Sequence, residues 1–158
     1  MAFDAEEVRK QVATLLASAE FTETLEEIYA EKGDTDPIDY PFEVHSSVQV
    51  SPQQFPCGEV QVDKGRNNAP DSMLVDLTYE VTIWWHQNGV TENLIDDQLG
   101  RLVRATQDFF KSRASFAPEL NVSCWLGDDD YSPFYPSNND LKPFMKSATQ
   151  IIFVRGIR

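Results

Sequence analysis

The sequence predicts an α+β fold, in which a mainly antiparallel sheet carries two main helices packed on one face and a long protruding β-hairpin. Two segments, 4–32 and 91–113, repeat apolar residues at the three- and four-residue spacing of an amphipathic helix. Several other segments alternate apolar and polar residues with the period of two that is typical of half-buried strands. At 158 residues and 41% hydrophobic content, the chain is expected to form a single domain, 1–158.

The first helical segment begins with the pattern of a capping box, in which Asp4 is followed three residues later by Glu7. Its apolar stripe consists of Val8, Val12, Leu15, Leu16 and Ala19. The stripe shifts at Phe21, which predicts either a kink or a second short helix capped by Thr22 or Thr24. The segment is expected to end by Gly33, before a turn.

The second main helix is predicted after a turn at Asn88-Gly89, with Thr91 as its cap. Its buried stripe recurs at helical spacing over about four turns. The residues of this stripe are Ile95, Leu99, Leu102, Val103, Thr106 and Phe110.

Alternation predicts strands at 42–50, at 59–63 and, most clearly, at 74–85. The polar residues 63–73 are expected to form the loop at the tip of a hairpin. Twelve residues of strand span about 40 Å, which is longer than most strands. We therefore expect the strand at 74–85 to be one arm of the protruding hairpin.

Two more strands are predicted at 122–126 and 148–157, with a long connecting loop at 127–147 between them. Loops of this length in compact domains are usually functional or disordered. The aromatic residues in 127–147 favour a functional loop.

The net charge of −13 is distributed unevenly. Residues 1–39 contain eleven acidic and three basic residues, whereas residues 141–158 contain four basic residues and no acidic one. General binding to nucleic acid is not expected, because phosphate contacts require Lys and Arg in number. The charge permits simple solubility, a basic protein partner or a surface that repels DNA.

Asp128, Asp129 and Asp130 are the most evident candidates for a metal site, because carboxylates bind Mg²⁺ and Ca²⁺. Adjacent side chains of an extended segment point in alternating directions, however, and the spacing of a calcium loop is absent. We expect these residues to be solvated or to contact a basic partner.

No other residue type occurs in a pattern that indicates catalysis, so the chain is not expected to be an enzyme or to hold a cofactor or a metal. His86 stands at a strand end, where a general base can lie, but no recognisable nucleophile accompanies it. His45 is interpreted as a residue of a polar strand face, and Cys57 and Cys124 as free thiols. The segment Lys64-Gly65-Arg66 lacks the spacing of a phosphate-binding loop.

A membrane location is not expected, because no apolar run approaches the roughly 20 residues that span a bilayer. The acidic N-terminus, with Glu6 and Glu7, lacks the basic start and apolar centre of a secretory signal. Synthesis in the cytoplasm is therefore expected.

The order of these elements resembles that of the tail-terminator and neck proteins of long-tailed bacteriophages. The features that carry the resemblance are the N-terminal helix, the long hairpin, the strand at 76–85, the helix at 91–113 and the β-rich C-terminal part. The resemblance implies a structural virion protein without catalytic residues, made in the host cytoplasm. It implies a homo-oligomeric ring, a hexamer, that caps the tail tube, contacts neck or connector proteins and meets DNA only as passing cargo.

A ring built from head-to-tail contacts needs two different, complementary patches on each subunit. The residues predicted to contact partners are Lys64, Arg66, Asp128, Asp129, Asp130, Arg155 and Arg158.

Two alternatives remain open. An acidic inhibitor that mimics DNA would need carboxylates spaced like phosphates, and Arg9 and Lys10 interrupt the acids of the first helix. A small metal-dependent hydrolase would use 128–130.

Overall fold

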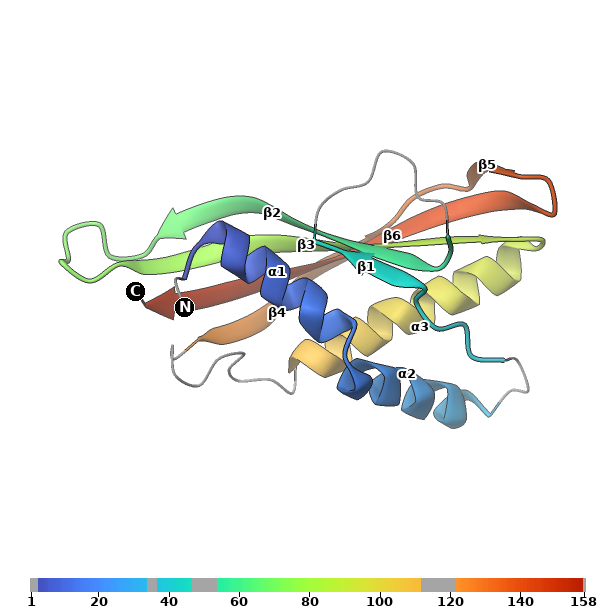
Figure 1. The fold of residues 1–158 in the computed structure, drawn as a ribbon, viewed down its shortest axis with the longest axis horizontal. Coiled ribbons are helices and arrows are strands. Elements are labelled where there is room, and N and C mark those ends of the chain that lie inside the picture. Colours follow the sequence, from blue (N-terminus) through green and yellow to red (C-terminus); the bar gives the residue numbers. More distant parts are fainter. Residues whose placement is uncertain (1–2, 34–36, 47–53, 112–121, 158) are drawn as a thin grey trace.

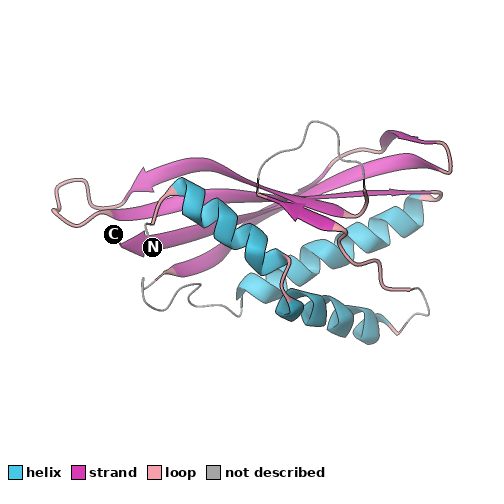
Figure 2. Cartoon of the chain, viewed as in Figure 1, coloured by secondary structure: helices cyan, strands magenta, loops and turns pink. Residues whose placement is uncertain are grey.

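The computed structural model describes residues 3–33, 37–46, 54–111 and 122–157 (Figure 1). Helices and strands are both abundant (Figure 2), which confirms the α+β class. The helices are α1 (Ala5–Leu16), α2 (Ala19–Lys32) and α3 (Glu92–Lys111). The strands are β1 (Glu43–His45), β2 (Cys57–Asn67), β3 (Asp76–Gly89), β4 (Ser123–Tyr131), β5 (Tyr135–Asn139) and β6 (Lys142–Ile157).

The strands form one sheet in the order β1-β2-β3-β6-β4, and β5 pairs with the first residues of β6. All pairs are antiparallel except β1 with β2, so the prediction of a mainly antiparallel sheet is confirmed. The longest pairing joins β3 to β6, from Asp76 opposite Ile157 to Gly89 opposite Phe144. This pairing forms the centre of the sheet.

The two N-terminal helices are separated by a cap rather than by a kink. Asp4 caps α1 as predicted, since its carboxylate accepts a hydrogen bond of 2.9 Å from the amide of Glu7. The second helix is capped by Ser18 and not by Thr22 or Thr24, because the serine hydroxyl already accepts from the Phe21 amide. Gly33 ends α2 in the left-handed conformation, at φ 67°.

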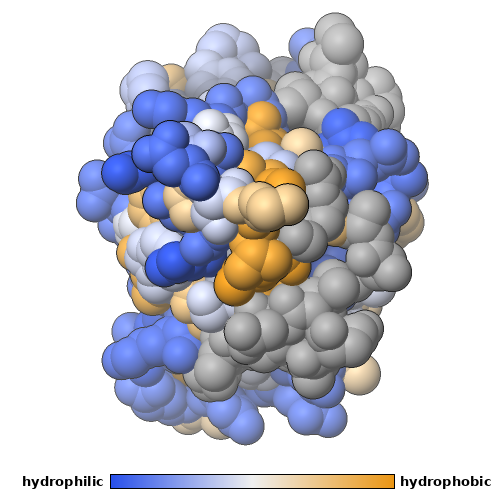
Figure 3. Space-filling view, turned by 90° about the vertical axis from the view of Figure 1, so that its left-hand side faces the viewer, coloured by the Kyte–Doolittle hydropathy of each residue, from blue (hydrophilic) through white to orange (hydrophobic). Residues whose placement is uncertain are grey.

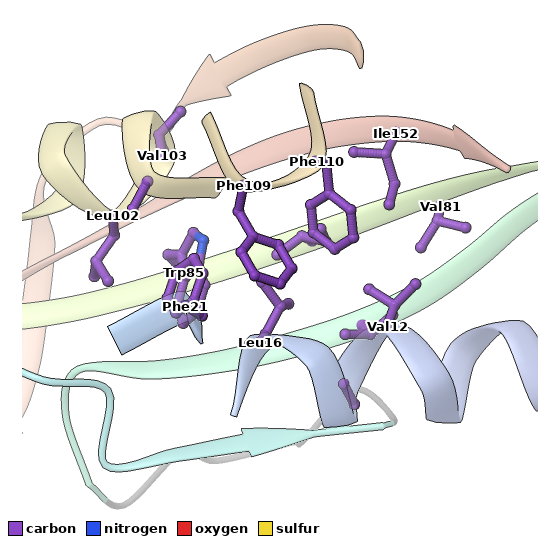
Figure 4. Packing of buried hydrophobic residues seen from close by; sticks show 14 of the residues in the cluster. Val12, Leu16, Phe21, Val81, Trp85, Leu102, Val103, Phe109, Phe110 and Ile152 are labelled. Atoms are coloured by element: carbon purple, nitrogen blue, oxygen red, sulfur yellow. The ribbon is translucent and has the colours of Figure 1, made fainter. Parts of the chain in front are cut away.

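Side chains of all three helices meet those of the sheet in one buried cluster (Figure 4). Trp85 of β3 lies near its middle and stacks on Phe21 of α2, with ring centroids 5.7 Å apart. Its indole nitrogen donates a hydrogen bond of 2.9 Å to the hydroxyl of Thr106 on α3. Gln107 of α3 contacts Gln150 of β6 in the same way, at 2.8 Å. The helices therefore contact odd-numbered residues of β3 and even-numbered residues of β6.

The prediction of a long loop at 127–147 is wrong. The strand β4 continues to Tyr131, β5 occupies Tyr135–Asn139 and β6 begins at Lys142. Most side chains of residues 128–145 are exposed. A strand that buries neither face shows no alternation of apolar residues, so the pattern on which the prediction depended is missing.

The predicted loop at 63–73 is shorter than expected, and the predicted turn at Asn88-Gly89 is absent. Residues 63–67 belong to β2, so the predicted tip loop at 63–73 is reduced to the connection between Asn67 and Asp76. Asn88-Gly89 is not a turn, since β3 runs through Gly89. A Cβ at Gly89 would lie 2.8 Å from the Ile95 side chain, so the glycine permits the close approach of α3.

The predicted strand at 42–50 is found only in part, as β1, and its residues 47–50 lie outside the described ranges. Among the described residues, no helix is long and apolar enough to cross a membrane.

Candidate protein-contact groove

The sheet face that points away from the helices carries a cluster of basic and aromatic side chains. The register places Arg66 of β2, Thr78 of β3 and Arg155 of β6 side by side across three strands. The next row contains Lys64, Glu80, Phe153 and Trp125, the last from β4. Both rows include even-numbered residues of β3, which alternate with the buried residues on the helical side.

These two rows line an open groove of about 650 Å³. Its lining residues are Lys64, Arg66, Asn68, Thr78, Glu80, Trp125, Phe153 and Arg155. The groove thus brings together three of the residues that the sequence predicted to contact partners.

A bulge in β2 directs the two β2 cations into the groove. Val62 pairs with Val81, but the next pair is Lys64 with Glu80, so Asp63 is left over. Without the extra residue, Lys64 would share the helical side with Val62. Asp63 accepts a hydrogen bond from the hydroxyl of Thr82, which holds the bulge in place.

Lys64 and Arg66 are exposed, and among the described residues neither forms an ion pair. Arg155 differs, because its Nε and Nη2 donate to the two carboxylate oxygens of Asp76 at 3.0 and 2.7 Å. The amide of Asn68 donates to the same carboxylate at 3.0 Å. Hydrogen bonds from Arg155 and then from Asn68 lower the pKa of Asp76 to about 2.

The aromatic part of the groove is a stacked pair, Trp125 and Phe153, with ring centroids 5.6 Å apart and an interplanar angle of 18°. Trp125 is 44% exposed. Large exposed aromatics with basic neighbours are typical of contact surfaces. Sequence reasoning missed both residues, although Trp125 stands between Cys124 and Leu126, out of phase with the apolar face of its strand.

The carboxylates of Asp128, Asp129 and Asp130 lie elsewhere, exposed on β4 at the edge of the sheet. A register shift separates Leu126 from Asp129 in this strand. Charged residues and bulges on an edge strand discourage pairing with other chains. In the described part of the chain, no group of three His, Cys, Asp or Glu side chains is placed to hold a metal ion. Arg158 lies outside the described residues.

The tip between β2 and β3 is a second exposed surface. Met73 is fully exposed and Leu74 is 61% exposed. Ile157, which pairs with Asp76 at the same end of the sheet, is 40% exposed. This end of the molecule shows an apolar patch next to hydrophilic side chains (Figure 3).

A buried polar chain crosses the same sheet face at the other end, where His86 was predicted to be a polar strand-end residue. Its Nδ1 lies 2.6 Å from the Ser147 hydroxyl, and its Nε2 lies 2.5 Å from a carboxylate oxygen of Glu59. The hydroxyl of Tyr135 lies 2.7 Å from the same serine oxygen. The four side chains come from four strands, so no sequence spacing could have revealed them.

These four side chains include the residue types of a serine hydrolase triad, but the serine hydroxyl is not accessible to a substrate. Ser147 is 4% exposed, and its oxygen already contacts both His86 and Tyr135. A nucleophile must reach a substrate carbonyl, so this arrangement is better suited to joining strands than to acyl transfer. Burial lowers the pKa of His86, and the neighbouring Glu59 carboxylate opposes this effect only in part.

Two further candidates, the thiol of Cys57 and the imidazole of His45, lie at the short edge strand β1. Cys57 is buried, which raises its pKa to about 12, and in the described part of the chain neither it nor Cys124 forms a disulfide. On β1, the Nε2 of His45 lies 3.4 Å from the Oε2 of Glu43. Neither geometry indicates a reactive centre.

A scan of protein-family models and a search of curated proteins found no match to this chain.

Proposed function

We propose that this chain is a structural virion protein of the tail-terminator or neck type, which forms a ring at the end of a phage tail tube and joins it to the head. In this proposal the subunits act through surfaces that bind other copies and neighbouring proteins. The element order on which the resemblance depends includes α1, β3 and α3.

The observation that best supports the proposal is the different character of the two sides of the sheet. The open side, which is the sheet face that points away from the helices, carries the groove with Lys64, Arg66 and the exposed Trp125. On the other side, α2 carries a set of exposed carboxylates, namely Glu20, Glu23, Glu26, Glu27 and Glu31. Two unlike, complementary patches are what a closed ring of head-to-tail contacts requires, whereas a two-fold dimer uses the same patch twice.

The proposal gives the hairpin of β2 and β3 a separate role. With the helices packed on one face of the sheet, the hairpin projects beyond them and carries Met73 and Leu74 at its tip. Exposed apolar residues at a projecting tip suit insertion into a neighbouring protein, here the tail tube.

The experiment is to measure the mass of the purified protein by light scattering and native mass spectrometry over a concentration series. The series is repeated with assembled tail tubes, and bound protein is counted after sedimentation. We expect a ring of one defined size, a hexamer, either free in solution or on the tube. A protein that stays monomeric at every concentration and does not sediment with tubes would contradict the proposal.

The exposed carboxylates of α2 also support a second candidate, an acidic inhibitor that mimics DNA. Glu20, Glu23, Glu27 and Glu31 recur at three- and four-residue spacing and so follow one side of the helix. Competition between this protein and DNA for a nuclease or repressor tests that role. Inhibition that is unaffected by converting these carboxylates to amides would contradict it.

A further inference from the structure

We infer that Lys64 and Arg66 of one copy receive Glu23 and Glu27 of a second copy, so that the groove is the socket for the acidic side of α2. This inference rests on the proposed head-to-tail assembly and names the residues that make its contact.

In the described part of the chain, none of these four charges forms an ion pair. Glu26 of α2 accepts a hydrogen bond from Tyr40 at 3.0 Å, and Glu31 pairs with Arg104 at 2.7 Å. Glu23 and Glu27 are exposed and, among the described residues, have no such partner. On the open side, Arg155 pairs with Asp76, whereas Lys64 and Arg66 pair with no carboxylate of the described ranges.

The spacing of the two pairs also matches. Glu23 and Glu27 are four residues apart on a helix, which separates them by about 6 Å along its axis. Lys64 and Arg66 are two residues apart on a strand and share one face, which separates them by about 7 Å. A helix lying along β2 can therefore place one carboxylate beside each cation.

The rest of the groove suits a helix rather than a nucleic acid strand. The stacked Trp125 and Phe153 provide an apolar floor, and the exposed Ala30 follows Glu27 on the same side of α2, where a small side chain permits close approach. Glu80 also lines the groove, so a continuous row of phosphates would meet this carboxylate, whereas the two carboxylates of a helix can lie beside the two cations alone. Two cations beside an apolar floor fit two carboxylates beside a small residue.

A charge-swap series measured by analytical ultracentrifugation tests the inference. The socket variant K64E/R66E and the helix variant E23K/E27K are each expected to weaken self-association on the order of 100-fold, because each places like charges together. An equimolar mixture of the two variants is expected to regain association, since each variant then offers a patch that the other can bind. The fourfold variant carrying all changes is expected to associate like the wild type.

Matched controls separate this contact from a general effect of charge. E92K/D97K changes the net charge as E23K/E27K does, and K111E/K142E changes it as K64E/R66E does, at exposed positions outside the groove and α2. Both controls are expected to associate like the wild type. Circular dichroism checks that every variant is folded.

The outcomes distinguish the inference from the proposed function. The socket is wrong if the wild type self-associates and each variant self-associates as strongly as the wild type. It is also wrong if the mixture of the two variants does not regain association. In both cases the ring proposal stands. If the wild type neither associates nor binds tubes, both are wrong. A fluorescent single-stranded oligonucleotide is tested in parallel, and tight binding that K64E/R66E abolishes, without self-association, would assign the groove to nucleic acid and overturn the inference.

Discussion

The position of His86 in the buried polar chain favours its neutral imidazole, because burial lowers the pKa of this residue. It is 9% exposed, and the carboxylate of Glu59 beside it is 2% exposed. With its proton on Nε2 facing Glu59, the ring presents Nδ1 as an acceptor for the Ser147 hydroxyl, which in turn accepts from Tyr135. A second proton would make Nδ1 a donor and reverse both hydroxyl contacts. The ionisable groups around the ring are Glu59 and Cys57 of β2 and Tyr135 of β5.

The first prediction concerns the pH dependence of stability at this residue. Burial lowers the pKa of His86 in the folded state below its ordinary value of 6.5. The unfolded chain therefore binds the proton first, and the free energy of unfolding falls as the pH drops below about 6.5, by about 1.4 kcal/mol for each unit by which the pKa is lowered. Urea unfolding of the wild type and of His86→Gln, which keeps a donor and an acceptor but does not titrate, measures this.

The difference between the two proteins is the quantity that matters, because the pH effects of groups that do not contact His86 cancel in it. The wild type is expected to lose stability relative to His86→Gln between pH 6.5 and the folded-state pKa, and no further below it. A difference that is constant over this range would show that His86 titrates alike in both states.

At the scale of elements, the contact between β3 and α3 includes a hydrogen bond inside the hydrophobic cluster. The indole nitrogen of Trp85 donates to Thr106, and both side chains are fully buried. The Thr106 hydroxyl in turn donates to the carbonyl of Leu102, one turn earlier in α3. Trp85 is the largest fully buried side chain in the described core, and Thr106 accepts the one hydrogen bond that its indole nitrogen can donate.

The second prediction is that Thr106→Val destabilises the protein by about 1–3 kcal/mol, since valine keeps the shape of threonine but leaves the indole N–H buried without a partner. Thermal and urea unfolding measure the loss. Thr106→Ser keeps the hydroxyl and is expected to cost less, although it removes a methyl group. Equal losses in the two variants would mean that packing, and not the hydrogen bond, matters at this position.

Much of the fold was predictable wherever an element buries one face. The alternation at 74–85 predicted β3, and Val81, Ile83 and Trp85 are indeed buried. The helical stripe that includes Ile95, Leu99 and Phe110 is also buried. The strands beyond the buried cluster could not be predicted, because residues such as Lys142 and Pro136 face solvent and give no periodic signal.

The groove was predictable only as a set of separate charges. Lys64, Arg66 and Arg155 stood out as cations in an acidic chain. Their convergence depends on the bulge after Val62 and on the register between three strands, which are properties of pairing and not of local sequence. For the same reason, the meeting of Trp125 with Phe153 could not be read from the chain.

At the scale of the whole molecule, the long sheet ends in a hairpin connection at each side (Figure 1). The connection between β2 and β3 carries the exposed Met73 and Leu74, and that between β5 and β6 carries Leu141, which is 83% exposed. A ring subunit needs contacts along the ring axis in addition to those around the ring. In the proposed ring, the two ends would provide the axial contacts, and the groove and α2 would provide those around the ring.

The last prediction assigns the tail tube to the end of the β2–β3 hairpin. Met73→Ser with Leu74→Ser is expected to leave the free energy of unfolding within about 0.5 kcal/mol of the wild type, because both side chains are exposed. The variant is expected to self-associate normally but to sediment with tail tubes much less than the wild type, since it lacks the apolar contact. Leu141→Ser serves as the control at the opposite end and is expected to bind tubes normally. If Leu141→Ser instead loses tube binding, the opposite end of the subunit contacts the tube. If both variants bind tubes normally, neither hairpin tip contacts the tube.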